Sequence, residues 1–324
     1  MPDKVLRGLG MVAAVFTWFT VIASAALAGG SWIESTAMPT ARSELAVTRL
    51  GARIYVAGGI GRMGTTDAFE AYDPATNSWA RLAPLPEPAH HLAMAAAGGR
   101  IYVSGGYADL RFRPDRKSVW AYEPKADKWE RVADMPLPRA AHKLVALDGK
   151  LYAVGGVGPN AKALLVYDPA TNRWDTSRAP LPTAREHLAA AAAGGKIYVI
   201  AGRWKGLGNL AVVEAYDPGI DSWSRMADLP AARGGHTAAT FRGHIHVTGG
   251  EDLAAGSTFA DHWFYDPATD RWRIGPAMPT ARHGLDSTAV DAGWYVVGGG
   301  TSAGYRTFFT LTAVIEVYTP GKHK

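Results

Sequence analysis

Short apolar runs that end in glycine recur along the whole chain. Six of them share an alternating or fully apolar stretch followed by a glycine pair or a close variant: IYVAGG at 54–59, IYVSGG at 101–106, LYAVGG at 151–156, IYVIAG at 197–202, IHVTGG at 245–250 and WYVVGG at 294–299. Successive runs begin 47, 50, 46, 48 and 49 residues apart. Runs of this length bounded by turn residues predict strands, and the fixed period predicts a repeat protein.

Two further signals follow in the same order within each repeat. Tyr-Asp-Pro or a variant begins at Tyr72, Tyr122, Tyr167, Tyr216, Tyr265 and Tyr318. A tryptophan stands seven residues after each of the first five tyrosines, whereas the sixth unit reaches YTPGKHK without one. Trp32 lies 10 residues before Arg42, the same distance that separates Trp129 from Arg139. We therefore predict that the N-terminal segment supplies the outer strand of the last unit, which closes a ring and pairs its edges.

Glycine pair, Tyr-Asp-Pro and tryptophan at this period resemble the kelch repeat over residues 29–324. Six such units imply an all-β, six-bladed β-propeller of four-stranded blades, similar to the central propeller of galactose oxidase and to exported bacterial kelch proteins. The pattern departs locally at Ala201, which replaces a glycine, and at Glu123 and Thr319, which replace the aspartate. The alanine-rich run 189–193 is expected to be an inner strand, because its equivalents in other units are strand-like.

The first 28 residues predict an export signal. Lys4 and Arg7 precede an apolar stretch that ends in the letters ALA at 26–28, a pattern that suits cleavage after residue 28. The alternative is an uncleaved membrane anchor, because the apolar run approaches the ~20 residues of a spanning helix. In either case residues 29–324 are expected to be exported, to the periplasm or the medium, and membrane contact is expected only if the segment stays uncleaved.

Composition excludes several kinds of chemistry. The chain has no cysteine, so disulfides, cysteine nucleophiles and the cysteine–tyrosine cofactor of copper radical oxidases are not available. A net charge of +5 weakly favours anionic partners. Nucleic-acid binding is not expected without aromatic-basic motifs. No cofactor is expected, and no metal, because no fixed ligand spacing joins the histidines; the protein is expected to be a monomer.

The lengths of the loops predict which face of the propeller carries the binding site. If strands a to d run from the axis outward, the d–a and b–c connections lie on the same face of the propeller. The interval between the second glycine and the tyrosine varies from 11 to 19 residues, and this variation falls in the b–c loops. Binding residues concentrate on loops that a rigid scaffold positions. We therefore expect the binding site on the d–a/b–c face.

The candidate site residues lie on that face. An arginine precedes strand a in five of the six units, where it either bridges blades or grips an anion, and histidines follow it in varying register. The candidate ligand-binding residues are Arg42, Arg139, Arg185, Arg233, Arg282, His91, His142, His236, His283 and Trp204. The adjacent Glu186 and His187 are candidates for acid–base catalysis, with a salt-bridged strand end as the alternative.

Three classes of function stay open. The first is a non-catalytic, exported propeller that binds an anionic small molecule, a glycan or an acidic protein segment. The second follows from a resemblance to exported kelch propellers that epimerise sialic acid (N-acetylneuraminate). It implies a sugar-acid isomerase in which Arg185, Glu186, His187 and Arg233 hold the substrate and move its proton. The third is a cell-surface adhesion or assembly module.

Overall fold

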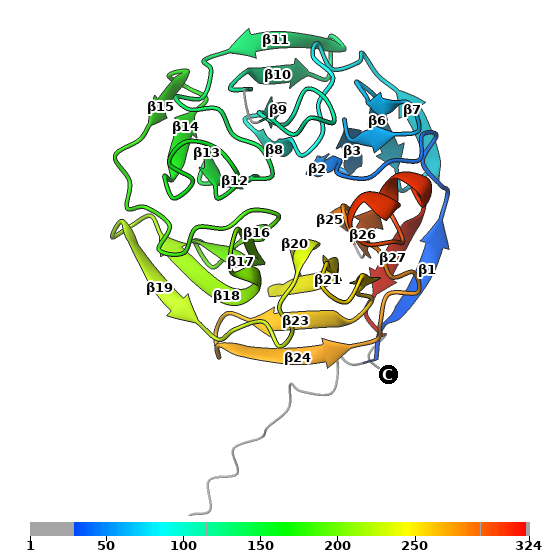
Figure 1. Ribbon diagram of the computed structural model, residues 1–324. Helices are drawn as coiled ribbons and strands as arrows, with labels where there is room; N and C mark the ends of the chain where they lie inside the picture. Colours follow the sequence, from blue (N-terminus) through cyan, green and yellow to red (C-terminus); the bar gives the residue numbers. More distant parts are fainter. Residues whose placement is uncertain (1–28, 114–115, 292, 322–324) are drawn as a thin grey trace, which may run out of the picture.

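The computed structural model describes residues 29–113, 116–291 and 293–321, which form six antiparallel blades around a central axis (Figure 1). Each blade has four main strands, so the predicted six-bladed β-propeller is confirmed. The export signal predicted within residues 1–28 lies outside the described residues. Within the described residues, no helix has both the length and the apolar character to cross a membrane.

Every blade runs outward from the axis through four successive strands. Blade 1 has β2 (Ala46–Leu50), β3 (Arg53–Ala57), β6 (Phe69–Asp73) and β7 (Ser78–Arg81); blade 2 has β8 (Ala93–Ala97), β9 (Arg100–Ser104), β10 (Val119–Glu123) and β11 (Lys128–Val132); blade 3 has β12 (Lys143–Leu147), β13 (Lys150–Val154), β14 (Leu165–Asp168) and β15 (Arg173–Asp175).

Blade 4 has β16 (Ala189–Ala193), β17 (Lys196–Trp204), β18 (Gly208–Asp217) and β19 (Ser222–Met226); blade 5 has β20 (Gly234–Phe241), β21 (His244–Asp252), β23 (His262–Asp266) and β24 (Arg271–Gly275); blade 6 has β25 (Asp286–Val290), β26 (Gly293–Val297), β27 (Ile315–Thr319) and β1 (Ser31–Ser35). Two of the b–c loops contain a further short strand pair. In blade 1 this pair is β4 (Ile60–Gly61) with β5 (Gly64–Thr65), and in blade 5 it is β22 (Ser257–Thr258) with the end of β21. The alanine-rich run predicted as an inner strand is β16.

The ring closes where the N-terminal strand joins the last blade. β1 pairs antiparallel with β27 from Ser31↔Thr319 to Ser35↔Ile315, and Figure 1 shows the blue strand beside the red one. The predicted closure is thereby confirmed. Because β1 covers the outer edge of β27, the last blade has the same four-strand width as the others.

Tryptophans of the outer strands tie each blade to its predecessor. In all six blades the indole Nε1 donates a hydrogen bond of 2.8–3.0 Å to a carbonyl that follows the previous outer strand: Trp32 to Pro276, Trp79 to Thr36, Trp129 to Ala83, Trp174 to Ala133, Trp223 to Ala179 and Trp272 to Ala227. The repeated tryptophan therefore joins each blade to the preceding one through a hydrogen bond.

The glycine pair makes the equivalent junction near the axis. In all six blades the second glycine, or Gly202 after Ala201, donates its N–H to the backbone carbonyl at the arginine position of the next blade, at 2.8–3.0 Å. The first glycine has a left-handed backbone, and a Cβ at Gly58 would lie 2.3 Å from the carbonyl oxygen of Ala89. Close approach of two backbones therefore requires glycine at position 58, whereas blade 4 accommodates Ala201 at the equivalent place.

Candidate functional site

The d–a and b–c connections meet on one face of the propeller, as the strand order predicts. Isolated bridges join Ser43 to Ile60, His90 to Tyr107, Ala140 to Val157, Glu186 to Arg203, and His283 to Gly300. Each bridge links the start of an inner strand to the b–c loop of its own blade. Residues from both kinds of connection therefore come together around the axis.

The five repeated arginines lie inside this face and have no exposed surface. In four blades the guanidinium pairs with an acid of the same blade at 2.6–2.9 Å: Arg42 with Glu70, Arg185 with Glu214, Arg233 with Asp261, and Arg282 with Glu316. Arg139 instead donates to backbone carbonyls, among them that of Ala163 at 2.9 Å. All five also donate to a backbone carbonyl of strand b.

In blade 2 Ala89 stands at the arginine position, and the acid and the base of the ion pair exchange places. There Glu87 accepts from Arg116 of the b–c loop at 2.8 Å, which again ties the d–a segment to the rest of the blade. Of the two roles left open for the repeated arginines, this geometry favours the structural one over anion binding, but each guanidinium ties the d–a connection to its own blade and does not bridge two blades. A ligand could reach these guanidinium groups only if the surrounding loops moved.

Six residues, one from each blade, form a closed ring of backbone hydrogen bonds at the mouth of the axis. The N–H of each donates to the carbonyl of the next at 2.6–3.1 Å, and we call them the axial ring: Glu44, Gly284, Gly235, His187, Ala141 and His91. Each stands two residues after the arginine position and has a φ between 50° and 67°. A left-handed backbone is strained for any residue but glycine, so the four side-chain-bearing members are held there by their neighbours.

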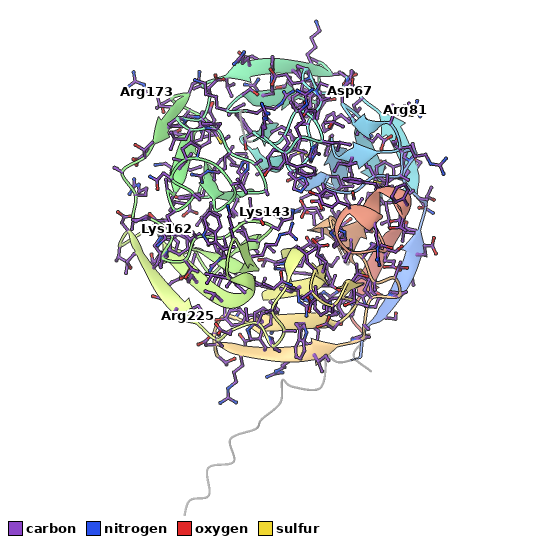
Figure 2. The ribbon with its side chains drawn as sticks, in the orientation of Figure 1. Asp67, Arg81, Lys143, Lys162, Arg173 and Arg225 are labelled. Carbon is purple, nitrogen blue, oxygen red and sulfur yellow. The ribbon has the colours of Figure 1, made fainter. Side chains whose placement is uncertain are left out.

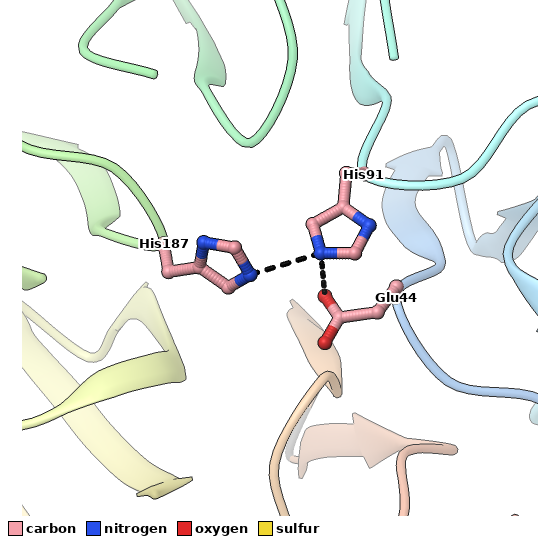
Figure 3. A group of neighbouring side chains, drawn as sticks. All are labelled: Glu44, His91 and His187. Carbon is pink, nitrogen blue, oxygen red and sulfur yellow. Dashed lines mark hydrogen bonds and ion pairs between the residues drawn. The ribbon is translucent and has the colours of Figure 1, made fainter. Parts of the chain in front are cut away.

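Three side chains of the axial ring converge at one point (Figure 3). The Nε2 atoms of His91 and His187 are 2.9 Å apart, and Glu44 Oε2 lies 3.3 Å from His91 Nε2. The other three members are alanine or glycine: Ala141 lies between the two histidines, and Gly235 and Gly284 lie between His187 and Glu44. The ring therefore brings two imidazoles and a carboxylate from three blades to one point.

Further charged groups connect these three into a continuous network. Glu186 contacts His187 Nδ1 and accepts from Arg203 Nε at 2.8 Å, while Arg203 also pairs with Glu251. Glu251 lies 3.4 Å from His283 Nδ1, which is 3.7 Å from Glu44. Three carboxylates face a single arginine in this network. The centre of the face is therefore acidic, although the chain as a whole is basic.

Burial changes the protonation of the network. The pKa of Glu44 is raised to about 7, first by burial and then by the negative charge of Glu251. The pKa of both His91 and His187 is held well below its ordinary value, chiefly by burial and further by nearby cationic or imidazole groups, including Arg203. Both imidazoles are therefore neutral at pH 7.

A pocket of about 320 Å³ opens above the axial ring, and we call it the axial pocket. Its floor is the charged network, and its walls include four aromatic side chains from the b–c loops: Tyr107, Phe112, Tyr305 and Phe308. Tyr305 and Phe308 belong to the 3-10 helix η1 (Gly304–Phe309) of blade 6. A wider groove of about 820 Å³ adjoins it between blades 4 and 5, lined by Trp204, Lys205 and Leu253 among others. The two share Arg203 and Glu186.

The remaining predicted residues fall on either side of the ring. His91, His187, His283 and Glu186 line the axial pocket, and Trp204 lines the groove. His142 and His236 are buried on the inner side, against a cavity of about 40 Å³. Deeper still, Lys143 reaches Asp286 at 2.9 Å, and Figure 2 shows Lys143 near the axis while Arg81, Arg173 and Arg225 lie at the rim.

Glu44, Arg203 and Glu251 are the charged residues of the pocket that the sequence reasoning did not select, and its four aromatic residues were not selected either. A usable signal exists for Glu44: it occupies the second place after the arginine, as His91 and His187 do after theirs. Arg203 and Glu251 also have a fixed place, because each directly follows the second glycine position of its repeat, at Gly202 and Gly250.

Comparison with known proteins agrees with the architecture. The solved structure of YjhT superposes with a TM-score of 0.73 at 20% sequence identity, over 89% of this chain and 99% of that one, which shows a shared fold. Kelch-like protein 26 of Mus musculus is 38% identical over 89 residues, and Kelch-like protein 36 of Rattus norvegicus is 36% identical over 103 residues. These alignments cover 28% and 29% of this chain, and this chain spans only 14% and 16% of the two relatives' length.

A family model covers nearly the whole propeller. The model described as KLHDC2/KLHL20/DRC7 Kelch-repeats domain matches residues 28–156 and 141–318. The matched residues include the five glycine pairs, Ala201-Gly202 in the fourth unit, and the tyrosine that follows each of them. With six blades joined by those glycines and by the outer-strand tryptophans, the chain belongs to the kelch-repeat family.

Proposed function

We propose that this protein is an exported, non-catalytic binding propeller that takes a carbohydrate in the axial pocket. Kelch-repeat propellers typically serve as binding modules for other proteins, which supports a binding role. The observation that carries the proposal is the composition of the pocket, which has aromatic walls over a floor of carboxylates and imidazoles. Its volume of about 320 Å³ lies at the lower end of the range for small-ligand sites.

The chemistry of the pocket suits a neutral sugar. The apolar face of a sugar ring packs on aromatic side chains such as Phe112 and Tyr305, while its hydroxyls donate to carboxylates and accept from N–H groups. Glu44, Glu186 and Glu251 supply the acceptors, and Arg203 supplies donors. An anionic sugar would meet three carboxylates and one arginine, so we infer that a neutral sugar binds better than a sugar acid.

Isothermal titration of the purified protein with neutral sugars and with their uronic and sialic acids tests this proposal. We expect saturable binding of a neutral sugar, weakened at least tenfold by Phe112→Ala or Tyr305→Ala. Phe309→Ala is the matched control, because Phe309 follows Tyr305 in η1 but is 89% exposed and does not line the pocket. Tighter binding of the acids, or equal binding by all three variants, would contradict the proposal.

A second candidate function is the isomerisation of a sugar acid. It is favoured by one observation: Glu186 contacts the imidazole of His187 inside the pocket, which is how a carboxylate orients a general base. Arg185 and Arg233, which were predicted to hold the substrate, are buried, so Arg203 would hold it instead. NMR detection of accelerated interconversion of sialic acid anomers, lost in His187→Gln, would establish catalysis and overturn the non-catalytic proposal.

A further inference from the structure

We propose that Glu44, His91 and His187 bind a single divalent transition-metal ion at the floor of the axial pocket. The inference goes beyond the proposed function and holds whether or not a sugar binds, because it rests only on the arrangement of ring side chains. Their ligand atoms all lie within 4.8 Å of one another (Figure 3). Two imidazoles and one carboxylate are a donor set that zinc, iron and cobalt accept.

The hydrogen-bond partners of the two imidazoles assign their tautomers. His187 Nδ1 contacts the carboxylate of Glu186, which only accepts, so this nitrogen carries the proton. His90 Nε2 lies 3.0 Å from the carbonyl of Asp109, so His90 donates there and its Nδ1 is an acceptor. His91 Nδ1 lies 2.6 Å from that acceptor and therefore carries its own proton. Both neutral imidazoles thus turn an unprotonated Nε2 toward the same point.

Two acceptor nitrogens consequently meet without a proton between them. The Nε2 atoms of His91 and His187 are 2.9 Å apart, although lone pairs at such a distance repel, and Glu44 Oε2 lies 3.3 Å from His91 Nε2. A cation between the three atoms turns this repulsion into three favourable bonds. Ligands bound to zinc at ~2.1 Å in a tetrahedral arrangement lie about 3.4 Å apart, which the 3.3 Å between Glu44 and His91 matches, whereas the 2.9 Å between the two imidazoles would have to widen.

A second shell of contacts already holds the three ligands in place. Arg203 fixes Glu186 behind His187, and the carbonyl of Asp109 fixes His90 behind His91. Carboxylate–histidine pairs of this kind orient metal-binding imidazoles. Glycine at position 284 makes room for the third ligand, because a Cβ there would lie 2.7 Å from Glu44 Oε1. The site is therefore preorganised by the axial ring.

The three ring members with small side chains leave the ion accessible. Ala141, Gly235 and Gly284 offer no side-chain ligand, so three protein ligands would be completed by oxygen donors from the pocket, such as water or a sugar hydroxyl. This open arrangement is typical of metal sites that bind or activate a ligand, in contrast to closed structural sites.

Cobalt and zinc are suitable probes for the experiment. The full chain is treated with a chelator, dialysed and titrated with Co²⁺, and its visible absorption and metal content are measured. We expect one ion per chain, an absorption spectrum of low coordination number, displacement by Zn²⁺, and two imidazole ligands in the X-ray absorption spectrum of the zinc form.

Glycine variants test the site without endangering the fold. His91→Gly and His187→Gly introduce the residue that the ring already has at Gly235 and Gly284, and glycine suits the left-handed backbone. We expect each to weaken metal binding by more than the ~10- to 100-fold typical of losing a second-shell partner. Ala141→Gly, the same backbone change at a ring position without a ligand, should leave the affinity unchanged. Failure of the wild-type chain to bind metal more tightly than the two histidine variants would overturn the proposal.

Discussion

A buried guanidinium paired with an acid recurs at the residue scale. Arg282 has no exposed surface and donates to Glu316 at 2.6 Å and to the carbonyl of Val296 at 3.1 Å. Burial lowers the pKa of Arg282, and the charge of Glu316 opposes this shift. Removal of one partner from such a pair leaves an uncompensated charge, whereas removal of both leaves none.

Glu316→Leu should therefore destabilise the protein by about 3–5 kcal/mol. Leucine is the residue that blade 3 has at the equivalent position, Leu165, so the shape is acceptable to the fold. The free energy of unfolding in urea gives the measurement. Combination with Arg282→Met should restore most of the loss, because no charge then remains buried. Losses that simply add in the double variant would refute the argument.

The sequence located the arginines but not their partners. Glu70 follows Arg42 by 28 residues, whereas Glu316 follows Arg282 by 34, because the intervening b–c loops differ in length. Counted from the tyrosine of the repeat, however, Glu70, Glu214 and Glu316 share one place, two residues before that tyrosine. The sequence therefore holds a signal for these three acids, whereas Asp261 stands outside it. Burial and pairing, which favour a structural role over anion binding, became visible only when strand c was placed against strand b.

At the element scale, blade 5 differs from the others in its middle strands. His246 of β21 and His262 of β23 are both fully buried, with His246 Nδ1 2.9 Å from His262 Nε2. Blade 1 has Tyr55 and Phe69 at the equivalent places, stacked with ring centroids 5.9 Å apart. Burial lowers the pKa of His246 well below its ordinary value and that of His262 to about 3.

Stability should fall as the pH falls below about 6.5, where unfolded histidines take up protons that the folded pair does not. Above that pH the pair is neutral in both states and its contribution is complete. The slope should be on the order of 1 kcal/mol per pH unit for each histidine.

The double variant His246→Tyr/His262→Phe gives blade 5 the tyrosine and phenylalanine that blade 1 has at these places. It should reduce the dependence of stability on pH, because neither new side chain takes up a proton in this pH range. Urea unfolding at pH 7 and pH 5 measures the difference, with the wild type as reference. An unchanged slope in the double variant would assign the acid sensitivity to other buried groups.

At the scale of the whole molecule, the sequence predicted what repeats and not what is unique. Six blades, the closure by Trp32 and the shared loop face all followed from a motif that recurs at a fixed period. The axial site did not, because Glu44, His91 and His187 stand 47 and 96 residues apart and meet only when the ring has closed. Each is unremarkable alone, and the left-handed ring that aligns them has no sequence signature beyond its place in the repeat.

Closure therefore controls both stability and the site. Removal of residues 1–36 deletes β1, with its five paired residues against β27 and the hydrogen bond from Trp32 to Pro276, and exposes the edge of β27. We expect a large drop in melting temperature and concentration-dependent association through that edge.

A chain that begins at Gly29, as the predicted signal cleavage would leave it, keeps β1 whole because this strand begins at Ser31. It should remain monomeric and stable. Light scattering and thermal unfolding of the two truncated chains compare them directly. A chain without β1 that stays monomeric and melts at the same temperature would show that the ring does not depend on this strand, and would remove the physical reason for joining the two ends of the repeat in one blade.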